Sequence, residues 1–284
     1  MSWMVLVFIS ITLFSIESLL NRVLMKKEKA DPFAQAFVFT LLGGLWALVV
    51  QLFRGKVSFT ISPEQLPFLL IIAVMVILGG VCVFAGFKHI EASEHTVLLT
   101  SSRIWAVLGA IVILGEGFTI KKLIGAGILV LGVLITTWKK QKFVFNKGAV
   151  FVLAAALFYA LGETLSFYVL RFMDSVNFMI IVSCISAVMM LIVKPKIVKK
   201  LSFYFDNIKH FSNIIVVTIF DMFANLFVFL AYQKGRNAIQ IGPIMSLQTI
   251  ITVILALIFL KETDKLPKKI IGAITATIGT ILLL

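Results

Sequence analysis

Apolar and polar positions follow one another in long blocks along the chain. Apolar runs of about 17–25 residues recur throughout, separated by short connections that carry lysines and helix breakers, such as KKEKADP at 26–32. A helix of that length crosses the ~30 Å hydrocarbon core of a bilayer. The pattern predicts an all-α polytopic membrane protein with ten transmembrane helices, at roughly 2–25, 32–53, 66–87, 95–114, 121–138, 148–172, 177–194, 212–233, 239–260 and 269–284.

The composition agrees with this pattern and excludes a soluble domain. Hydrophobic residues make up 61% of the chain and charged residues 14%, and the mean hydropathy is +1.09. A soluble domain needs more polar surface than this to cover its core. The net charge of +13 would favour nucleic-acid binding in a soluble chain, but the Lys and Arg residues lie almost entirely in the connections. We therefore expect a multi-pass protein of the cell membrane whose partners include the lipid bilayer and no nucleic acid.

The sequence contains none of the common enzyme motifs. H-E-x-x-H, G-x-S-x-G, the P-loop and C-x-x-C are all absent, and the three histidines lie in or beside connections. Cys82 and Cys184 fall within apolar runs, so they are interpreted as small buried hydrophobic residues and not as a disulfide. We expect no enzymatic activity, no cofactor and no metal site.

The two halves of the chain resemble each other at an offset of 146 residues. ESLLNRVL at 17–24 aligns with ETLSFYVL at 163–170, and the ends of both halves match again near the same offset. This predicts two repeats of five helices each, at 1–140 and 146–284. Because five is odd, the second repeat enters the membrane from the opposite side, so the repeats are inverted. Inverted repeats place a binding site near the middle of the membrane and let access alternate between its two faces.

Four stretches carry a family resemblance: KADPF at 29–33, LLTSSRIWAVLGAIVILGEGFTIKKLIGAGILVLGVLI at 98–135, FLAYQKGRNA at 229–238 and LIFLKETDKLPKKIIGAITATIGTILL at 257–283. In their order and spacing they resemble the EamA-type, ten-helix members of the drug/metabolite transporter superfamily. The resemblance implies a secondary transporter of small organic metabolites, with helices 1–4 and 6–9 around a central cavity and helices 5 and 10 packed outside it. Members commonly have proline where this chain has Arg103 and Thr249, so the resemblance leaves the helix break at these positions open.

Four charged residues fall inside predicted helices: Glu17, Arg103, Glu163 and Asp221. A charge near the bilayer centre costs about 2.5–3.5 kcal/mol on insertion scales, so such residues face a cavity or a partner. Glu17 and Glu163 are separated by the repeat offset and are predicted to face each other across the axis between the repeats. Two nearby carboxylates cannot both ionise cheaply, so one of them could couple proton movement to substrate movement. The alternatives are structural ion pairs with Arg103 or positions near a helix end.

Arg103 has three interpretations. Its planar guanidinium could hold the carboxylate of an anionic or zwitterionic substrate. It could instead form a structural ion pair with Glu17, Glu163 or Asp221. It could also extend along its helix towards the lipid headgroups.

The remaining candidates for substrate binding are Asn21, Asn225, Tyr159, Gln248 and Trp105. Each of the first three lies four residues from an acidic residue and shares its helix face. Gln248 lies beside Thr249, and Trp105 could stack against a substrate. Polar residues in membrane helices also serve as contacts between helices, so a structural role remains the alternative.

Small residues recur in the last predicted helix of each repeat. Gly125, Gly127 and Gly132 lie in the first repeat, and Gly272, Ala276 and Gly279 lie in the second. Such residues allow close helix contact, either within one chain or in a homodimer.

The distribution of positive charge bears on orientation. Of the 26 Lys and Arg residues, 18 belong to connections on the side opposite the termini. The positive-inside rule then places both termini outside the cytoplasm, whereas the resemblance implies cytoplasmic termini, so orientation and direction stay open. The function expected is transport of a small polar metabolite, such as an amino acid, by alternating access, with a proton or another ion as the coupling partner. The alternative is a membrane sensor or assembly partner that uses the same fold without transport.

Overall fold

The computed structural model describes residues 2–26, 30–55, 61–106, 108, 119–139, 142–143, 146–205, 208–235, 238–263 and 265–283. The first half contains α1 (Trp3–Met25), α2 (Pro32–Arg54), α3 (Leu66–His89), α4 (Ala92–Leu99) and α6 (Ile120–Thr137). The second half contains α7 (Lys147–Val169), α8 (Ser175–Val193), α10 (Ile208–Gly235), α11 (Ala238–Leu260) and α12 (Leu266–Leu283). Shorter elements in the connections are β1 (Trp138–Lys139), β2 (Lys142–Phe143), the 3-10 helix η1 (Pro195–Lys200) and α9 (Ser202–Phe205).

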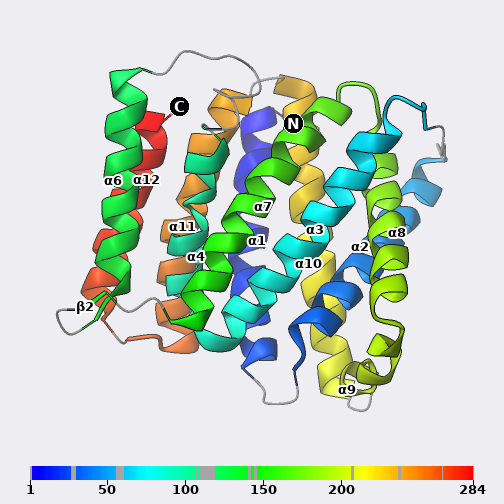
Figure 1. Cartoon of the computed structure of the whole chain (residues 1–284), viewed down its shortest axis with the longest axis horizontal. Helices are drawn as coiled ribbons and strands as arrows, with labels where there is room; N and C mark the ends of the chain where they lie inside the picture. Colours follow the sequence, from blue (N-terminus) through cyan, green and yellow to red (C-terminus); the bar gives the residue numbers. More distant parts are fainter. Residues whose placement is uncertain are drawn as a thin grey trace.

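The long helices form one bundle with both chain termini at the same end (Figure 1). The first helix, α1, begins at that end, whereas its counterpart α7 begins at the opposite end, beside the β1–β2 hairpin (Figure 1). The two repeats therefore run in opposite directions, as predicted. Six described helices are long and apolar enough to cross a membrane by length and composition. The prediction of a multi-pass, all-α membrane protein is confirmed.

Helix starts follow local capping chemistry at the polar connections. Asp31 accepts a hydrogen bond from the Ala34 N–H at 2.9 Å, and Pro32 occupies the first position of α2. Asn146 caps α7 in the same way, with its side-chain oxygen 2.8 Å from the Ala149 N–H. Each cap satisfies a backbone donor that the helix itself leaves unpaired.

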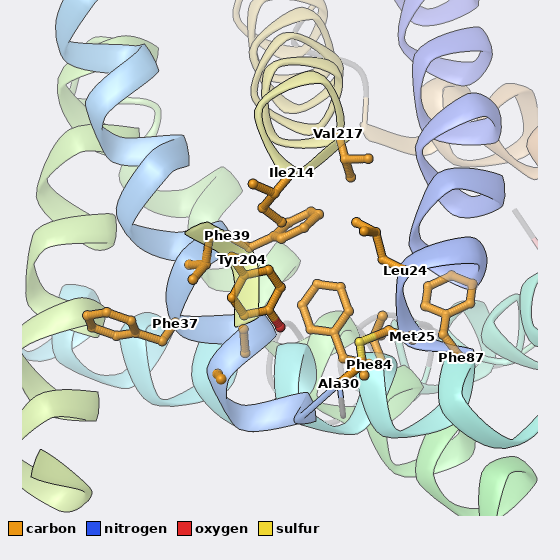
Figure 2. Packing of buried hydrophobic residues seen from close by; sticks show 14 of the residues in the cluster. Leu24, Met25, Ala30, Phe37, Phe39, Phe84, Phe87, Tyr204, Ile214 and Val217 are labelled. Atoms are coloured by element: carbon orange, nitrogen blue, oxygen red, sulfur yellow. The ribbon is translucent and has the colours of Figure 1, made fainter. Parts of the chain in front are cut away.

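Aromatic packing fills the end of the bundle opposite the termini. Phe84 of α3 and Phe39 of α2 have ring centroids 4.7 Å apart, and Tyr204 of α9 is buried beside them (Figure 2). Ile214 of α10 and Leu24 of α1 close the cluster. The cluster joins elements of both repeats by burial of apolar surface.

The small residues of α6 and α12 pack these two helices against each other. A Cβ at Gly279 would lie 2.3 Å from the Leu129 nitrogen, and one at Gly132 would lie 2.5 Å from the Ala276 nitrogen. Any larger side chain would push the backbones apart. This contact is within one chain, which settles the role of Gly132 and Gly279. Gly127 is different, because nothing lies within 4 Å of its Cβ position.

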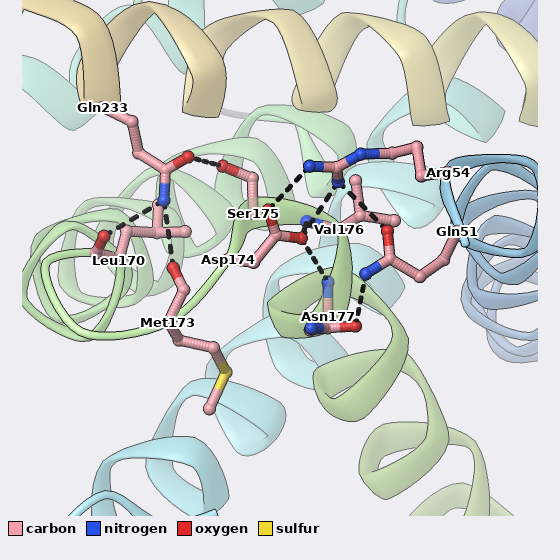
Figure 3. A network of polar contacts seen from close by, with 9 residues as sticks. All are labelled: Gln51, Arg54, Leu170, Met173, Asp174, Ser175, Val176, Asn177 and Gln233. Atoms are coloured by element: carbon pink, nitrogen blue, oxygen red, sulfur yellow. Dashed lines mark hydrogen bonds and ion pairs between the residues drawn. The ribbon is translucent and has the colours of Figure 1, made fainter. Parts of the chain in front are cut away.

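Polar side chains join α2 to α8 at the end of the bundle that carries the termini (Figure 3). Arg54 makes two parallel hydrogen bonds to Asp174, at 3.0 and 3.1 Å, and Gln51 donates to Asn177 at 2.8 Å. Burial alone would raise the pKa of Asp174, but the Arg54 guanidinium and the N–H groups at the start of α8 outweigh it and lower that pKa. The carboxylate of Asp174 therefore stays ionised at neutral pH and holds the two helices together.

The two cysteines are free thiols. Cys82 is half-buried in α3, but Cys184 is exposed on the surface of α8. The expectation that Cys184 is buried was wrong, because an apolar run in a membrane helix has a lipid-facing side as well as a packed one.

Candidate functional site

A cavity of about 390 Å³ lies between the two repeats. Its wall is formed by α1, α2, α3, α4, α7, α8, α10, α11 and the helical residues that follow α4. No described residue of α6 or α12 lines it, so these two helices are peripheral. Aromatic rings form much of the wall: Phe14, Phe39, Phe84, Phe87, Phe158, Tyr159, Phe178 and Phe229. A concave, mostly apolar site with a few convergent polar groups is the usual form of a small-molecule site.

The helix that carries Arg103 is broken beside this cavity. α4 ends at Leu99, Thr100 and Ser101 form a turn, and residues 102–106 are helical again. The Ser101 N–H donates to Leu98 and the Arg103 N–H to Thr100, both at 3.1 Å and both in the tighter i to i+3 pattern. The prediction of one unbroken helix over 95–114 was wrong at this point. The part of that span from 109 onwards lies outside the described residues.

Threonine side chains account for the break without a proline. Thr100 donates its hydroxyl to the Thr96 carbonyl at 2.9 Å, and such back-bonding bends helices. The same hydroxyl oxygen lies 2.8 Å from that of Thr249 in α11. In the second repeat α11 runs through Thr249 without interruption. The discontinuity is therefore present in one repeat only.

The start of α4 is held by a residue of the other repeat. Glu262, at the end of α11, accepts hydrogen bonds from the N–H groups of Ala92 and Ser93 at 3.1 and 3.2 Å and from the Ser93 hydroxyl at 2.6 Å. Its side chain is 8% exposed. Beside it, Lys269 of α12 pairs with Glu91, whose own side chain does not cap α4. A carboxylate at a helix N-terminus satisfies backbone donors and favours the helix dipole.

Arg103 forms an ion pair with Glu163 across the cavity wall. The Arg103 Nη1 atom lies 3.1 Å from Glu163 Oε2 and 3.4 Å from Oε1. Both side chains are largely buried but reach the cavity. Of the three interpretations of Arg103, the structure contains the ion pair, and its partner is Glu163.

Glu17 and Asp221 form a second charged group on the same wall. Glu17 accepts a hydrogen bond from Asn21, and Asp221 accepts one from Asn225 at 3.1 Å. The charge of Asp221 acts directly on Glu17, and Tyr159 lies within electrostatic reach of both. No described Lys or Arg forms an ion pair with Glu17 or Asp221. Glu17 and its repeat counterpart Glu163 therefore have different partners and do not pair with each other.

Most predicted site residues lie on the cavity wall. Those that do are Glu17, Arg103, Tyr159, Glu163, Asp221, Asn225 and Gln248. Asn21 lies behind the wall, fully buried between Glu17 and Gln35. Trp105 is also absent from the wall and is 40% exposed on the outside of the bundle.

His95 was missed as a site residue. Its position in the polar stretch SEHT suggested a connection, but the structure places it inside α4, where it is 1% exposed. Its ring stacks on Phe87 with centroids 3.7 Å apart, and both residues line the cavity. The polar stretch is the start of a helix that Glu262 caps, and no signal in the local sequence distinguishes this from a loop.

The sequence matches the EamA-like transporter family twice, over residues 1–138 and 146–284. The chain belongs to the EamA-like transporter family. The double match also confirms the duplication, since each EamA unit corresponds to one half of the bundle. The chain is thus a membrane transporter of the drug/metabolite transporter superfamily.

The EamA fold recurs in a solved structure described only as the crystal structure of a protein. The two share 15% sequence identity with a TM-score of 0.66, and the match covers 99% of this chain and 95% of the other. At that identity the likeness shows the fold alone. Comparison with curated proteins gives no match.

Proposed function

We propose that this chain is a secondary transporter that moves a small polar metabolite, such as an amino acid or a related compound, by alternating access. The observation that carries the proposal is a cavity between two inverted repeats with charged residues on its wall. Inverted-repeat transporters bind substrate at the repeat interface, often beside a discontinuous helix such as the one interrupted at Thr100.

The same proposal includes coupling to protons through Glu17. The titratable and charged groups around it are Asp221, Tyr159, His95 and the Arg103–Glu163 pair. Glu163 is already neutralised by Arg103, whereas Glu17 faces another acid. A carboxyl group next to a second carboxyl group can hold a proton that a cationic ligand or an outward-facing state would release.

A flux assay tests this function. Protein reconstituted in vesicles should accumulate a labelled amino-acid mixture in a saturable way, and an imposed pH gradient should increase the rate. Glu17→Gln should reduce the stimulation by the pH gradient about tenfold, which corresponds to ~1.4 kcal/mol of coupling. The matched control is Glu64→Gln, because Glu64 is exposed outside the membrane helices.

Two results would contradict the proposal in different ways. Flux that responds equally to pH in Glu17→Gln and unmodified protein removes proton coupling through this residue. A protein that binds solutes in detergent but moves none of them across vesicles supports the alternative function, a sensor or assembly partner with the same fold.

A further inference from the structure

The charged groups of the cavity break the symmetry between the repeats. Glu17 and Glu163 are separated by 146 residues and occupy corresponding positions in α1 and α7. Glu163 has a guanidinium partner in Arg103 at 3.1 Å. Glu17 has Asn21 as its hydrogen-bond donor and the carboxylate of Asp221 as its charged neighbour. One acid is matched with a cation, and its counterpart is left with a second acid.

Packing fixes these two unmatched acids in one place. α1 and α10 lie against each other, and the Ser10 hydroxyl of α1 donates to the Ala224 carbonyl of α10 at 2.8 Å. Asn225 orients Asp221 by a hydrogen bond within α10. Two carboxylates held together away from bulk water need a proton or another cation between them.

An independent observation in the same cavity points to a ligand. His95 is 1% exposed and lines the cavity, and neither of its ring nitrogens has a hydrogen-bond partner within the described part of the chain. Buried polar groups are almost always paired, so an unpaired one on a cavity wall indicates that a bound molecule supplies the partner. The nearby rings of Tyr159 and Phe158 offer aromatic faces, which attract organic cations.

We propose that the cavity binds a small organic cation, with a protonated amine placed between Glu17 and Asp221 and an apolar body against the aromatic wall. The amine gives Glu17 the positive partner that Arg103 gives Glu163. A substrate carboxylate is not required, because the only described guanidinium on the wall is already engaged with Glu163. This inference rests on the proposed transport function, since it names the chemical class of the substrate.

Three probes of one size separate charge from hydrophobic binding. They are phenethylammonium, 2-phenylethanol and 3-phenylpropanoate, which carry a cation, a neutral hydroxyl and an anion on the same ring. Their dissociation constants are measured by calorimetry on the purified full-length protein in detergent. Phenethylammonium should bind at least tenfold more tightly than either of the other two.

Variants locate the site. Asp221→Asn and Glu17→Gln should each weaken phenethylammonium binding at least tenfold and leave 2-phenylethanol unchanged, whereas Glu64→Gln should change neither. Equal affinities for the three probes, a preference for the anion, no binding of any probe, or cation binding that is insensitive to both variants would overturn the inference. Should a variant fail to fold, the comparison of probes on the unmodified protein decides alone.

This experiment separates the inference from the function on which it rests. Selective binding of phenethylammonium without flux of any solute contradicts transport and leaves the cation site in place. Flux of amino acids or other solutes by a protein that does not prefer the cation contradicts the cation site and leaves transport in place.

Discussion

Replacing Arg103 with glutamine is expected to abolish transport and to lower the free energy of unfolding by about 2 kcal/mol. The substitution leaves Glu163 on the cavity wall without its cation. Removing one partner of a fully buried ion pair costs about 3–5 kcal/mol, and this pair loses less because water in the cavity reaches both side chains. The loss of function should be larger than the loss of stability, because the uncompensated acid changes the charge of the whole cavity.

A double-mutant cycle separates the two effects. Arg103→Gln, Glu163→Gln and the combined variant are compared by thermal unfolding and by flux in vesicles. The combined variant should recover most of the stability, since no buried charge is left unpaired, but not the flux. Full flux in the combined variant would mean that the pair is structural alone. Arg103→Gln protein that unfolds but binds its solute unchanged would lead to the same conclusion.

Replacing Glu262 with alanine is expected to lower the free energy of unfolding by about 2–4 kcal/mol. Three donors at the start of α4 lose their acceptor, and Ala92 and Ser93 are too deeply buried to hydrogen-bond to water instead. An unsatisfied buried donor costs about 1–3 kcal/mol, and the Ser93 hydroxyl can turn towards another acceptor. Since α4 leads directly to Arg103, transport should fall as well.

Chemical or thermal unfolding of the purified protein measures this effect. Glu262→Gln keeps one acceptor oxygen and should lose about half as much stability as Glu262→Ala. Glu64→Ala provides the control for removal of an acid, because Glu64 lies exposed. A Glu262→Ala protein as stable as the Glu64→Ala protein would show that the cap does not hold α4 in solution.

The fold and most of the cavity wall could be predicted from the sequence. The length of the apolar runs determines the number of spans, and the 146-residue offset determines the inversion. Charge in a membrane helix is costly enough that Glu17, Arg103, Glu163 and Asp221 had to face an interior space, and they do.

The remaining features depend on packing between distant segments. Glu262 caps a helix 169 residues away from it, at Ser93, and the local sequence around either residue does not indicate this contact. The rotation of a helix about its axis is equally hidden, because runs that are apolar all round give no preferred face. For that reason Trp105 was expected on the wall and lies outside, and His95 was expected in a connection and lies inside.

Accessibility of one cavity position from both sides of the membrane tests the central claim most directly. In a protein with Cys82→Ala and Cys184→Ala, the half-buried wall residue Thr40 is changed to cysteine and exposed to a membrane-impermeant thiol reagent on either side of sealed vesicles. Alternating access predicts labelling from each side, because the cavity opens to one face at a time and both states are populated. Labelling from one side alone, with or without substrate, would contradict the account.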